Sequence, residues 1–275
     1  MYPRKPLSSK AQSASPELTP QALAERQGDL LCLSDLHLGP QRPELTALFL
    51  RFCQDIPAEV TDLCILGDLF DFWVHRQQAQ EEPQLQVLTA LRALTRRGIR
   101  VWVMTGNRDF ALAPATLRAF DLRPLADPMI LPGGMVLTHG DLLCTNDVRY
   151  LRFRRVIRNP FVLSFLRMLP YGALLTLGRQ LRQGSHRELR KKSAAITQAT
   201  TAGIRAALRG EGLFASTSAP YRILIHGHTH QPIDEEIPEL HAHRFVLSDW
   251  QESGATLLRC SPAGSCRLWH YPVAS

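Results

Sequence analysis

We expect an α/β fold from the sequence of 275 residues, on three grounds. First, from Asp29 onward, short apolar runs of strand length alternate with longer segments in which apolar residues recur at helical spacing. Second, hydrophobic residues make up 45% of the chain, which is enough for a substantial core. Third, a charged fraction of 21% with 17 Gly and 19 Pro excludes the disordered, collagen-like and coiled-coil classes.

The expected strands of the main part of the chain are short and apolar, and helices lie between them. We expect strands at residues 30–33, 63–66, 101–104, 135–137 and 223–225. We expect helices at residues 44–54, 82–97 and 114–120, the last of which begins with a proline that the first helical turn tolerates. Near the C-terminus, residues 243–247, 255–260 and 267–271 have strand composition, and the Gly-containing turns between them indicate an antiparallel meander.

The intervals between the residues that follow these strands indicate one insertion. Asp35, Asp68, Asn107 and His139 are separated by 33, 39 and 32 residues, each about the length of one strand and one helix. The next interval, from His139 to His228, is 89 residues. We therefore expect extra helices at about residues 147–208, inserted into a domain that spans residues 28–275. Twelve Lys and Arg residues and one acid lie between positions 149 and 192, so this segment carries a net charge of +11.

Three further features of the sequence bear on where in the cell the protein resides. The first 27 residues are rich in Ser, Pro, Gln and Ala and lack the apolar run of a signal peptide, so we expect a disordered leader at residues 1–27. The longest apolar stretch, residues 161–178, is interrupted by Arg167 and Pro170 and is too short for a bilayer span. The six cysteines include no CxxC pair, which favours structural thiols in a reduced, cytoplasmic setting. They are Cys32, Cys53, Cys64, Cys144, Cys260 and Cys266.

Polar side chains follow each of the five expected strands of the main part. The segments are Ser-Asp-Leu-His from Ser34, Gly-Asp-Leu-Phe-Asp from Gly67, Gly-Asn-Arg-Asp from Gly106, His-Gly-Asp from His139 and His-Gly-His-Thr-His from His226. In open α/β sheets, ligands bind at the carboxyl ends of the strands, so we expect these segments to meet at one site. Each motif alone is common in turns and at strand ends. Their joint order and spacing carry the prediction.

Seven of these side chains form a set of three oxygen and four imidazole donors that suits metal ions. The set is Asp35, His37, Asp68, Asn107, His139, His228 and His230. Without cysteine it favours Mn, Fe or Zn, and it is larger than one ion needs, so we expect two ions with Asp68 between them. Two divalent ions outweigh the two carboxylates by two positive charges, so the site would attract a phosphate. The net charge of +7 of the chain also favours an anionic partner. Metals about 3.5–4 Å apart lower the pKa of a shared water and hold the oxygens of a phosphoryl group during in-line attack.

The remaining histidines lack the pattern. We expect His226 to pack beside the ligands and the others to be surface or packing residues. These others are His75, His186, His241, His243 and His270.

Residues 29–250 resemble the calcineurin-like metallophosphoesterase superfamily, whose motifs are D-x-H, G-D-x-x-D, G-N-H-D/E, H-G-D and G-H-x-H. The resemblance implies a sandwich of two β-sheets flanked by helices. Arg108 stands where most members have a His that can protonate a leaving alkoxide. Arginine cannot donate a proton near neutral pH, but it can hold a phosphate oxygen with two hydrogen bonds. The chain is therefore expected to cleave an anhydride, from which a phosphate leaves without being protonated.

Two longer runs, at residues 106–110 and 139–147, followed by Tyr150, are similar to the UDP-2,3-diacylglucosamine diphosphatase family of lipid A biosynthesis. This resemblance implies hydrolysis of the pyrophosphate of UDP-2,3-diacylglucosamine to UMP and 2,3-diacylglucosamine 1-phosphate, with Mn as the metal at both positions, although Fe and Zn also suit the ligands. It implies that one ion is held by Asp35, His37, Asp68 and His230, and the other by Asp68, Asn107, His139 and His228. The catalytic residues implied are Asp35, His37, Asp68, Asn107, Arg108 and His139. The substrate contacts implied are Asn107, Arg108, Asp147, Ser185, Lys192 and His228.

The same family resemblance implies that the insertion is a helical lid over the acyl chains. Leucines and phenylalanines between residues 161 and 177, flanked by arginines, have the composition of an interfacial amphipathic element, although an ordinary helical hairpin with a solvated basic face would look similar. The lid departs from the family pattern at Leu189, where an Asn is expected, and lacks the Met-Asp-Val expected near residues 197–199.

We expect a monomer that associates peripherally with the cytoplasmic face of the inner membrane, takes a glycolipid substrate and binds no nucleic acid. The alternatives are another nucleotide pyrophosphohydrolase, a nuclease that uses the basic insertion to track phosphates, or a non-catalytic scaffold. The apolar residues of the insertion and Arg108 argue against a nuclease. The complete set of ligands argues against a scaffold.

Overall fold

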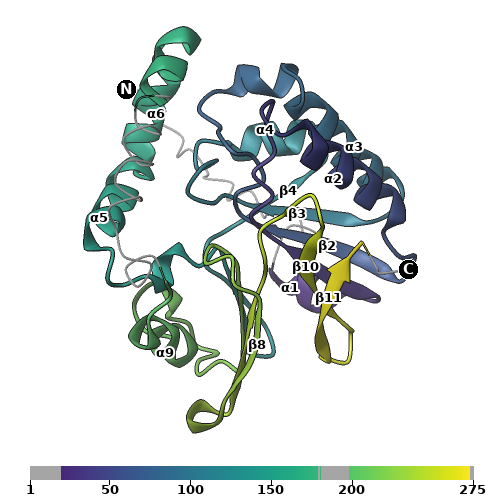
Figure 1. Cartoon of the computed structure of the whole chain (residues 1–275). Coiled ribbons are helices and arrows are strands. Elements are labelled where there is room, and N and C mark those ends of the chain that lie inside the picture. Colours follow the sequence, from purple (N-terminus) through teal and green to yellow (C-terminus); the bar gives the residue numbers. More distant parts are fainter. Residues whose placement is uncertain (1–19, 179, 181–197, 273–275) are drawn as a thin grey trace, which may run out of the picture.

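The computed structural model describes residues 20–178, 180 and 198–272. Two β-sheets pack against each other, and helices lie on their outer sides (Figure 1). The strand order is β11-β10-β1-β2-β3-β4 in the first sheet and β5-β6-β7-β9-β8 in the second. The α/β fold class and the sandwich of two sheets that the family resemblance implies are therefore confirmed.

The first sheet combines four parallel strands with an antiparallel hairpin. The parallel strands are β1 (Asp29–Leu33), β2 (Val60–Leu66), β3 (Arg100–Met104) and β4 (Arg123–Leu125), and the hairpin consists of β10 (Ala255–Cys260) and β11 (Cys266–Tyr271). The connections between the parallel strands contain α2 (Pro43–Asp55), the short 3-10 helix η2 (Arg76–Gln80), α3 (Gln84–Arg96) and α4 (Pro114–Ala119). The expected strands and helices of this half are all present.

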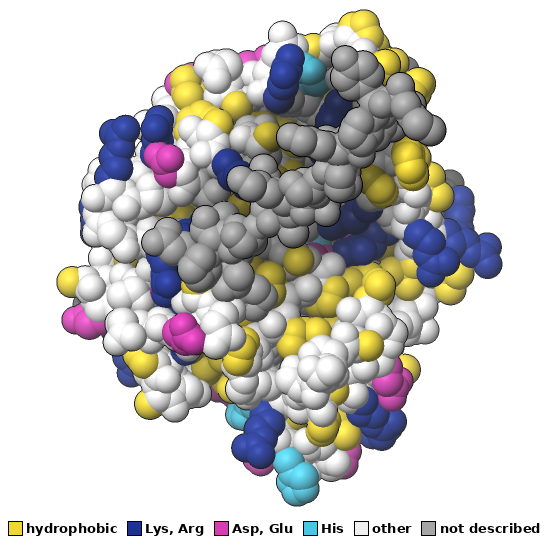
Figure 2. Space-filling view, turned by 180° about the vertical axis from the view of Figure 1, so that it is seen from behind, with side chains coloured by type: hydrophobic (Ala, Val, Ile, Leu, Met, Phe, Trp, Pro, Cys, Tyr) yellow, Lys and Arg dark blue, Asp and Glu magenta, His cyan; other side chains and the backbone are white. Residues whose placement is uncertain are grey.

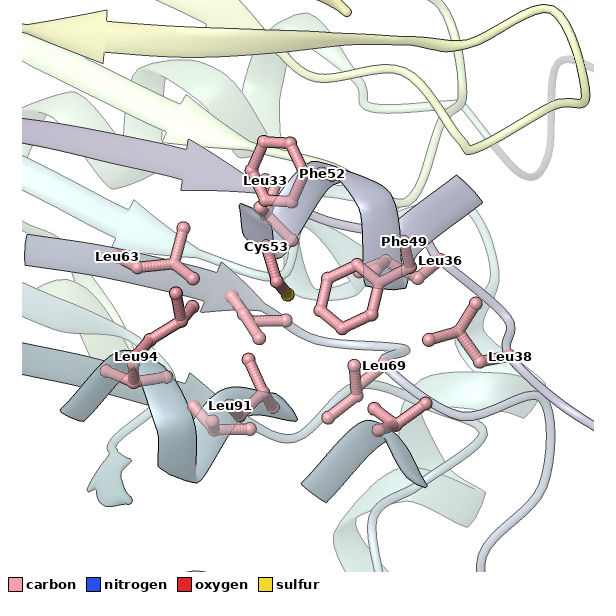
Figure 3. Close-up of a cluster of buried hydrophobic side chains, with 14 of the residues drawn as sticks. Leu33, Leu36, Leu38, Phe49, Phe52, Cys53, Leu63, Leu69, Leu91 and Leu94 are labelled. Carbon is pink, nitrogen blue, oxygen red and sulfur yellow. The ribbon is translucent and has the colours of Figure 1, made fainter. Parts of the chain in front are cut away.

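Successive residues of a strand face opposite sides of the sheet, so the central strands contribute to two cores. Leu33 of β1 lies beneath the helices, in a buried cluster with Phe49 of α2 and Leu91 of α3 (Figure 3). Its neighbour Cys32 faces the other way and belongs to a cluster that also contains Ile225 of the second sheet. The first cluster fixes the helices on the sheet, and the second holds the two sheets together.

The second sheet has three parallel strands, β6 (Met135–Thr138), β7 (Ile223–His226) and β9 (Ala242–Val246), flanked by the antiparallel strands β5 (Met129–Leu131) and β8 (Ile233–Ile237). Parallel neighbours such as β6 and β7 need a crossover connection. Helix α9 (Thr201–Arg209) lies in this connection, and its Ile204 and Leu208 are buried in a third cluster with Leu224 of β7. Three short 3-10 helices complete this half: η3 (Asp141–Leu143), η4 (Gly212–Phe214) and η5 (Pro238–Leu240).

The expectation of a C-terminal meander is wrong. β9 lies in the second sheet between β7 and β8, whereas β10 and β11 pair in the first sheet. Consecutive strands of a sandwich can belong to different sheets, and the composition of a strand does not say which one. The sequence analysis also missed β4 and β5, which have three residues each, and β8, whose central acids make it an exposed edge strand.

The insertion contains α5 (Val148–Ile157), α6 (Pro160–Met168) and a helical segment at residues 171–178, and α5 and α6 project to one side of the sandwich (Figure 1). We call residues 148–178 the lid. The expected boundary near residue 208 is too late, because α9 packs into the body of the sandwich as the crossover to β7. The expected leader at residues 1–27 is too long, because residues 20–24 form helix α1 (Pro20–Ala24) with a fully buried Leu23.

One pair of cysteines differs from the expected thiols. Antiparallel pairing places Cys260 of β10 opposite Cys266 of β11, with a distance of 4.1 Å between their Cα atoms, and the two form a disulfide. The other four cysteines are buried and take part in no disulfide. Among the described residues, no helix combines the length and apolar character needed to cross a bilayer.

Candidate metal centre

Backbone hydrogen bonds join the loop after β1 to the loop after β2, and the loop after β6 to the loop after β7. The N–H of Asp35 donates to the carbonyl oxygen of Gly67 at 3.1 Å, and the N–H of His37 donates to that of Asp68 at 3.0 Å. The N–H of Gly227 donates to the carbonyl oxygen of His139 at 2.9 Å. Side-chain contacts described below add the loop after β3. The five strand ends therefore converge, as their sequence spacing predicts.

The backbone is strained where these side chains are presented. The described part of the chain has seven non-glycine residues with positive φ, and five of them belong to the expected ligand set: Asp35, His37, Asp68, His228 and His230. Left-handed backbone is costly for residues with a Cβ atom and concentrates at functional sites. The fold thus holds these five side chains in orientations that a relaxed loop would not give.

Asp35, His37 and His230 form a first group of possible ligands. The Nε2 atoms of the two histidines are 3.5 Å apart, and Oδ1 of Asp35 lies 3.3 Å from Nε2 of His230 and 4.0 Å from Nε2 of His37. The other oxygen, Oδ2, accepts the backbone N–H of His228 at 2.7 Å. This hydrogen bond fixes the carboxylate so that Oδ1 faces the two imidazoles.

Asn107, His139 and His228 form a second group. Oδ1 of Asn107 lies 2.9 Å from Nε2 of His139 and 3.1 Å from Nδ1 of His228. Nδ1 of His139 donates to the carbonyl oxygen of Leu66 at 2.9 Å, so a neutral ring presents the lone pair of Nε2 to the amide oxygen. Two acceptor atoms this close need a proton or a metal cation between them.

Asp68 lies between the two groups. Its Oδ2 atom is 3.8 Å from Nδ1 of His37 and 3.9 Å from Nε2 of His139. Its Oδ1 atom accepts the backbone N–H of Arg108 at 2.8 Å, which joins the loop after β3 to the loop after β2. A Cβ atom added to Gly106 would lie 2.1 Å from Oδ1, so only glycine leaves room for the carboxylate in this position.

The charges of the group favour the binding of cations. Burial, together with the carboxylates of Asp109 and Asp35, raises the pKa of Asp68 to about 7, although His139 acts in the opposite direction. Burial lowers the pKa of His37 to about 3, and burial with the charge of His139 lowers the pKa of His228 to about 4. Burial also acts against the charged forms of His139 and His230, but the carboxylates of Asp68 and Asp35 raise the pKa of His139 to about 9, and Asp35 raises the pKa of His230, so metal binding would displace the proton of His139. Neutral imidazoles are the form that binds metals, and a nearby cation would stabilise the ionised form of the buried carboxylate.

The seven side chains fit two divalent metal ions. Nδ1 of His37 is buried and has no hydrogen-bond partner, which leaves a lone pair for a ligand. The donors are imidazole, carboxylate and amide atoms, and Asp35, Asp68 and His139 also lie within one possible cluster. The first group with Asp68 would hold one ion, and the second group with Asp68 would hold the other.

The other expected site residues are placed differently. Nη1 of Arg108 donates to Oδ1 of Asp71 at 3.1 Å, and its Nε lies 3.8 Å from Oδ2 of Asp68, so the guanidinium stands beside the ligands. Asp147 is the N-cap of α5 and accepts the N–H of Tyr150 at 3.1 Å. Ser185 and Lys192 lie outside the described residues.

Several aspartates that the sequence analysis did not assign support the ligands. Asp109 is fully buried and accepts the N–H groups of Leu69 and Gly106, so it connects the loops that carry Asp68 and Asn107. Asp127 accepts the N–H of His139 at 3.2 Å, and Oδ2 of Asp249 lies 3.6 Å from Nδ1 of His230. The Gly-Asn-Arg-Asp segment contains Asp109, so its sequence pattern could have indicated this residue. Asp127 and Asp249 are isolated acids, and no motif marks them.

His226 is not a ligand in this arrangement. Nε of Arg244 donates to its Nε2 at 3.0 Å, and its Nδ1 donates to the carbonyl oxygen of Gly227 at 2.8 Å. Both ring nitrogens are therefore used, and the ring supports the loop that carries His228 and His230.

Two of the remaining histidines in the described part of the chain take part in other contacts. His75 stacks on Tyr171 at the base of the lid, and His243 forms an ion pair with Asp234 on the second sheet.

Comparison with known proteins gave two findings. A model of the calcineurin-like phosphoesterase family matches residues 29–232. A protein named UDP-2,3-diacylglucosamine hydrolase from Azotobacter vinelandii is 38% identical over 232 residues, which cover 82% of this chain and 92% of that protein. Proteins with the same name from Stutzerimonas stutzeri and Pseudomonas aeruginosa are 38% and 36% identical over 233 residues, which cover 83% of this chain and 93% of each relative.

Proposed function

The chain belongs to the calcineurin-like phosphoesterase family, and on this premise we propose that it hydrolyses the pyrophosphate bond of UDP-2,3-diacylglucosamine to UMP and 2,3-diacylglucosamine 1-phosphate. The observation that carries the proposal is an apolar pocket that begins at the metal-ligand loops and continues under the lid. Phe110 and Ala111, which lie in the same loop as Asn107 and Arg108 and follow Asp109, line this pocket. A substrate with a pyrophosphate next to acyl chains matches both the metal-ligand loops and the apolar pocket.

The two groups of ligands would hold the pyrophosphate through two divalent cations, and we propose that these are Mn²⁺. Bound cations of this kind lower the pKa of water and hold phosphoryl oxygens. The protein positions the ligands by the strained backbone and the hydrogen bonds to Asp35 and Asp68. Asp68, whose Oδ2 faces both groups, would share its carboxylate between the two ions.

Arg108 would bind an oxygen of the reacting phosphate. Its side chain is 26% exposed, so it can exchange its contact with Asp71 for a contact with substrate. A guanidinium stabilises the charge that develops on the phosphoryl oxygens in the transition state, but it cannot protonate the leaving group. This suits an anhydride, in which the leaving phosphate needs no proton.

The pocket under the lid would accept acyl chains. Helix α6 contributes Leu163 and Leu166, and the helical segment at residues 171–178 contributes Leu174 and Leu177. The other lining residues are Val74, Phe110, Ala111, Ile157, Arg167 and Gly178. The apolar surface that the sequence predicts for the lid is thus divided, because these leucines face the pocket while other apolar residues of α6 face solvent.

We also propose that the solvent-facing side of the lid binds a membrane. Phe161, Phe165 and Met168 of α6 are 84%, 62% and 81% exposed, and their spacing places them on one face of the helix. Arg152 and Arg155 of α5 are exposed as well. Figure 2 shows basic and hydrophobic side chains gathered on the side of the molecule where the lid lies, which is on the right in this view. Such a surface would bind anionic lipids of the cytoplasmic face of the inner membrane.

The active unit would be a monomer, because one chain supplies all seven ligands. The alternatives, a nucleotide pyrophosphohydrolase without lipid specificity and a nuclease, would leave the apolar pocket without a role. The test is to incubate the protein and Mn²⁺ with UDP-2,3-diacylglucosamine in ¹⁸O water. We expect UMP and 2,3-diacylglucosamine 1-phosphate, with the label on one of them identifying the phosphorus attacked. No product from a protein that binds the metal would contradict the substrate assignment.

A further inference from the structure

Three side chains on one face of helix α5 and at its C-cap, Arg158, connect the lid to the loops that carry the second group of ligands. Tyr150, Arg154 and Arg158 follow one another at intervals of four residues, so they point the same way from the helix. Arg154 is buried and the other two are half-buried, whereas Arg152 and Arg155 between them are exposed. The inward face of α5 therefore carries two cations and a phenol where a packing helix would carry apolar residues.

Arg158 holds the backbone just before Asn107. Its Nη2 atom donates to the carbonyl oxygens of Thr105 at 3.0 Å and Gly106 at 2.7 Å, and its Nη1 lies 3.4 Å from Oγ1 of Thr105. On the other side of Asn107, the N–H of Arg108 donates to Asp68. The peptide groups on both sides of this ligand are thus fixed, one by the lid and one by the body of the protein.

Arg154 reaches His139 through one intermediate. Its Nη2 pairs with Oδ2 of Asp127 at 2.5 Å, and Oδ1 of Asp127 accepts the backbone N–H of His139 at 3.2 Å. Its Nε donates to Asp141 at 2.7 Å. Arg154 thereby supports the loop after β6 at two points.

Tyr150 completes the contacts with the third ligand of the group. Its hydroxyl donates to Asp141, and its ring stacks on His228 with 6.5 Å between the ring centroids. All three ligands of the second group, Asn107, His139 and His228, therefore lie one or two contacts away from α5.

We propose that Arg158 and Arg154 are positioning residues for the second metal ion, and that they couple the placement of the lid to the geometry of that ion. Neither needs to touch substrate or metal. Each orients a loop that carries a ligand, and residues that orient metal ligands typically contribute about 10- to 100-fold to metal affinity or activity. The inference rests on the proposed function, since it assumes that the two groups bind two ions.

The test is titration of the full chain with Mn²⁺ alone, in which the free ion is measured by electron paramagnetic resonance. We expect Arg158→Ala to lower the affinity for the second ion by about 10- to 100-fold and to leave the affinity for the first ion unchanged. Arg158→Lys should give an intermediate affinity for the second ion. Asn107→Ala identifies the binding step that belongs to the second ion. The matched control is Arg155→Ala, an exposed arginine of the same helix, which should bind both ions like the wild type.

A double variant separates positioning from general stability. If Arg158 acts through Asn107, adding Arg158→Ala to the Asn107→Ala variant should not lower the affinity for the second ion any further. Wild-type affinity for both ions in Arg158→Ala would overturn the proposal. An equal loss of affinity for both ions, or loss of the fold in both Arg158 variants, would overturn it as well. The titration needs no substrate, so failure of the substrate assignment leaves its result unaffected.

Discussion

Replacement of Gly106 by alanine tests how tightly the metal centre depends on the close approach of two loops. The added Cβ would lie 2.1 Å from Oδ1 and 2.5 Å from the backbone nitrogen of Asp68. An ordinary contact begins at 3.4 Å, so Oδ1 must move by about 1.3 Å if it alone gives way. This movement also breaks the hydrogen bond from the N–H of Arg108. Since a displacement of about 1 Å at a reacting centre costs about 100-fold in rate, we expect kcat to fall by at least about 100-fold.

The assay is release of UMP at saturating Mn²⁺ and substrate, together with the number of Mn²⁺ ions bound per chain. The matched control is Gly172→Ala in the lid, where an added Cβ meets nothing within 4 Å and the residue is helical. It should keep wild-type kcat and an equal or slightly higher melting temperature, because alanine is the better helix former. Wild-type kcat with two bound ions in Gly106→Ala would refute the packing argument.

Three other changes test separate parts of the account. Asp68→Ala should abolish binding of at least one ion, measured by elemental analysis, and lower kcat by at least 10²–10³-fold, on the order of the loss of one preorganised electrostatic group; normal turnover would contradict the shared carboxylate. Leu166→Asn in the pocket should raise KM for the diacylated substrate by about 10-fold, from about 1.5 kcal/mol of lost apolar contact, and should change KM for a short-chain analogue little. The control is Leu213→Asn, at a leucine that is 68% exposed and lies in η4 outside the lid, and an equal effect of Leu166→Asn on both substrates would show that the pocket does not recognise the acyl chains. Replacing Phe161 and Phe165 by serine should weaken flotation with anionic vesicles by at least about 10-fold while the short-chain analogue is hydrolysed normally, and unchanged flotation would exclude this face as the membrane contact.

The sequence predicts well which side chains lie together, because the seven expected ligands follow buried strands. Asp35, Asp68 and Asn107 come directly after apolar runs of strand length, and parallel neighbouring strands bring their ends to the same edge. The seven expected ligands therefore lie together even though they span residues 35–230. The supporting residues are harder to find. Asp127 and Asp249 act through hydrogen bonds and ion pairs that depend on the tertiary fold.

The errors in the fold have a common cause. Whether a strand joins one sheet or the other, as β9 and β10 show, depends on contacts distant in sequence and not on its own residues. The same holds for α9, whose buried Ile204 and Leu208 give it an amphipathic pattern that fits a lid helix as well as a crossover. The disulfide between Cys260 and Cys266 depends on the register of the hairpin, which the spacing of the two residues does not specify.

The central claim, that two cations lie on either side of Asp68, is tested most directly by a crystal structure of the protein grown with Mn²⁺, with the ions located by anomalous scattering. The account predicts two peaks within bonding distance of the Asp68 carboxylate. One should lie beside Asp35, His37 and His230, and the other beside Asn107, His139 and His228. A single peak, or peaks away from Asp68, in a protein that releases UMP would contradict it.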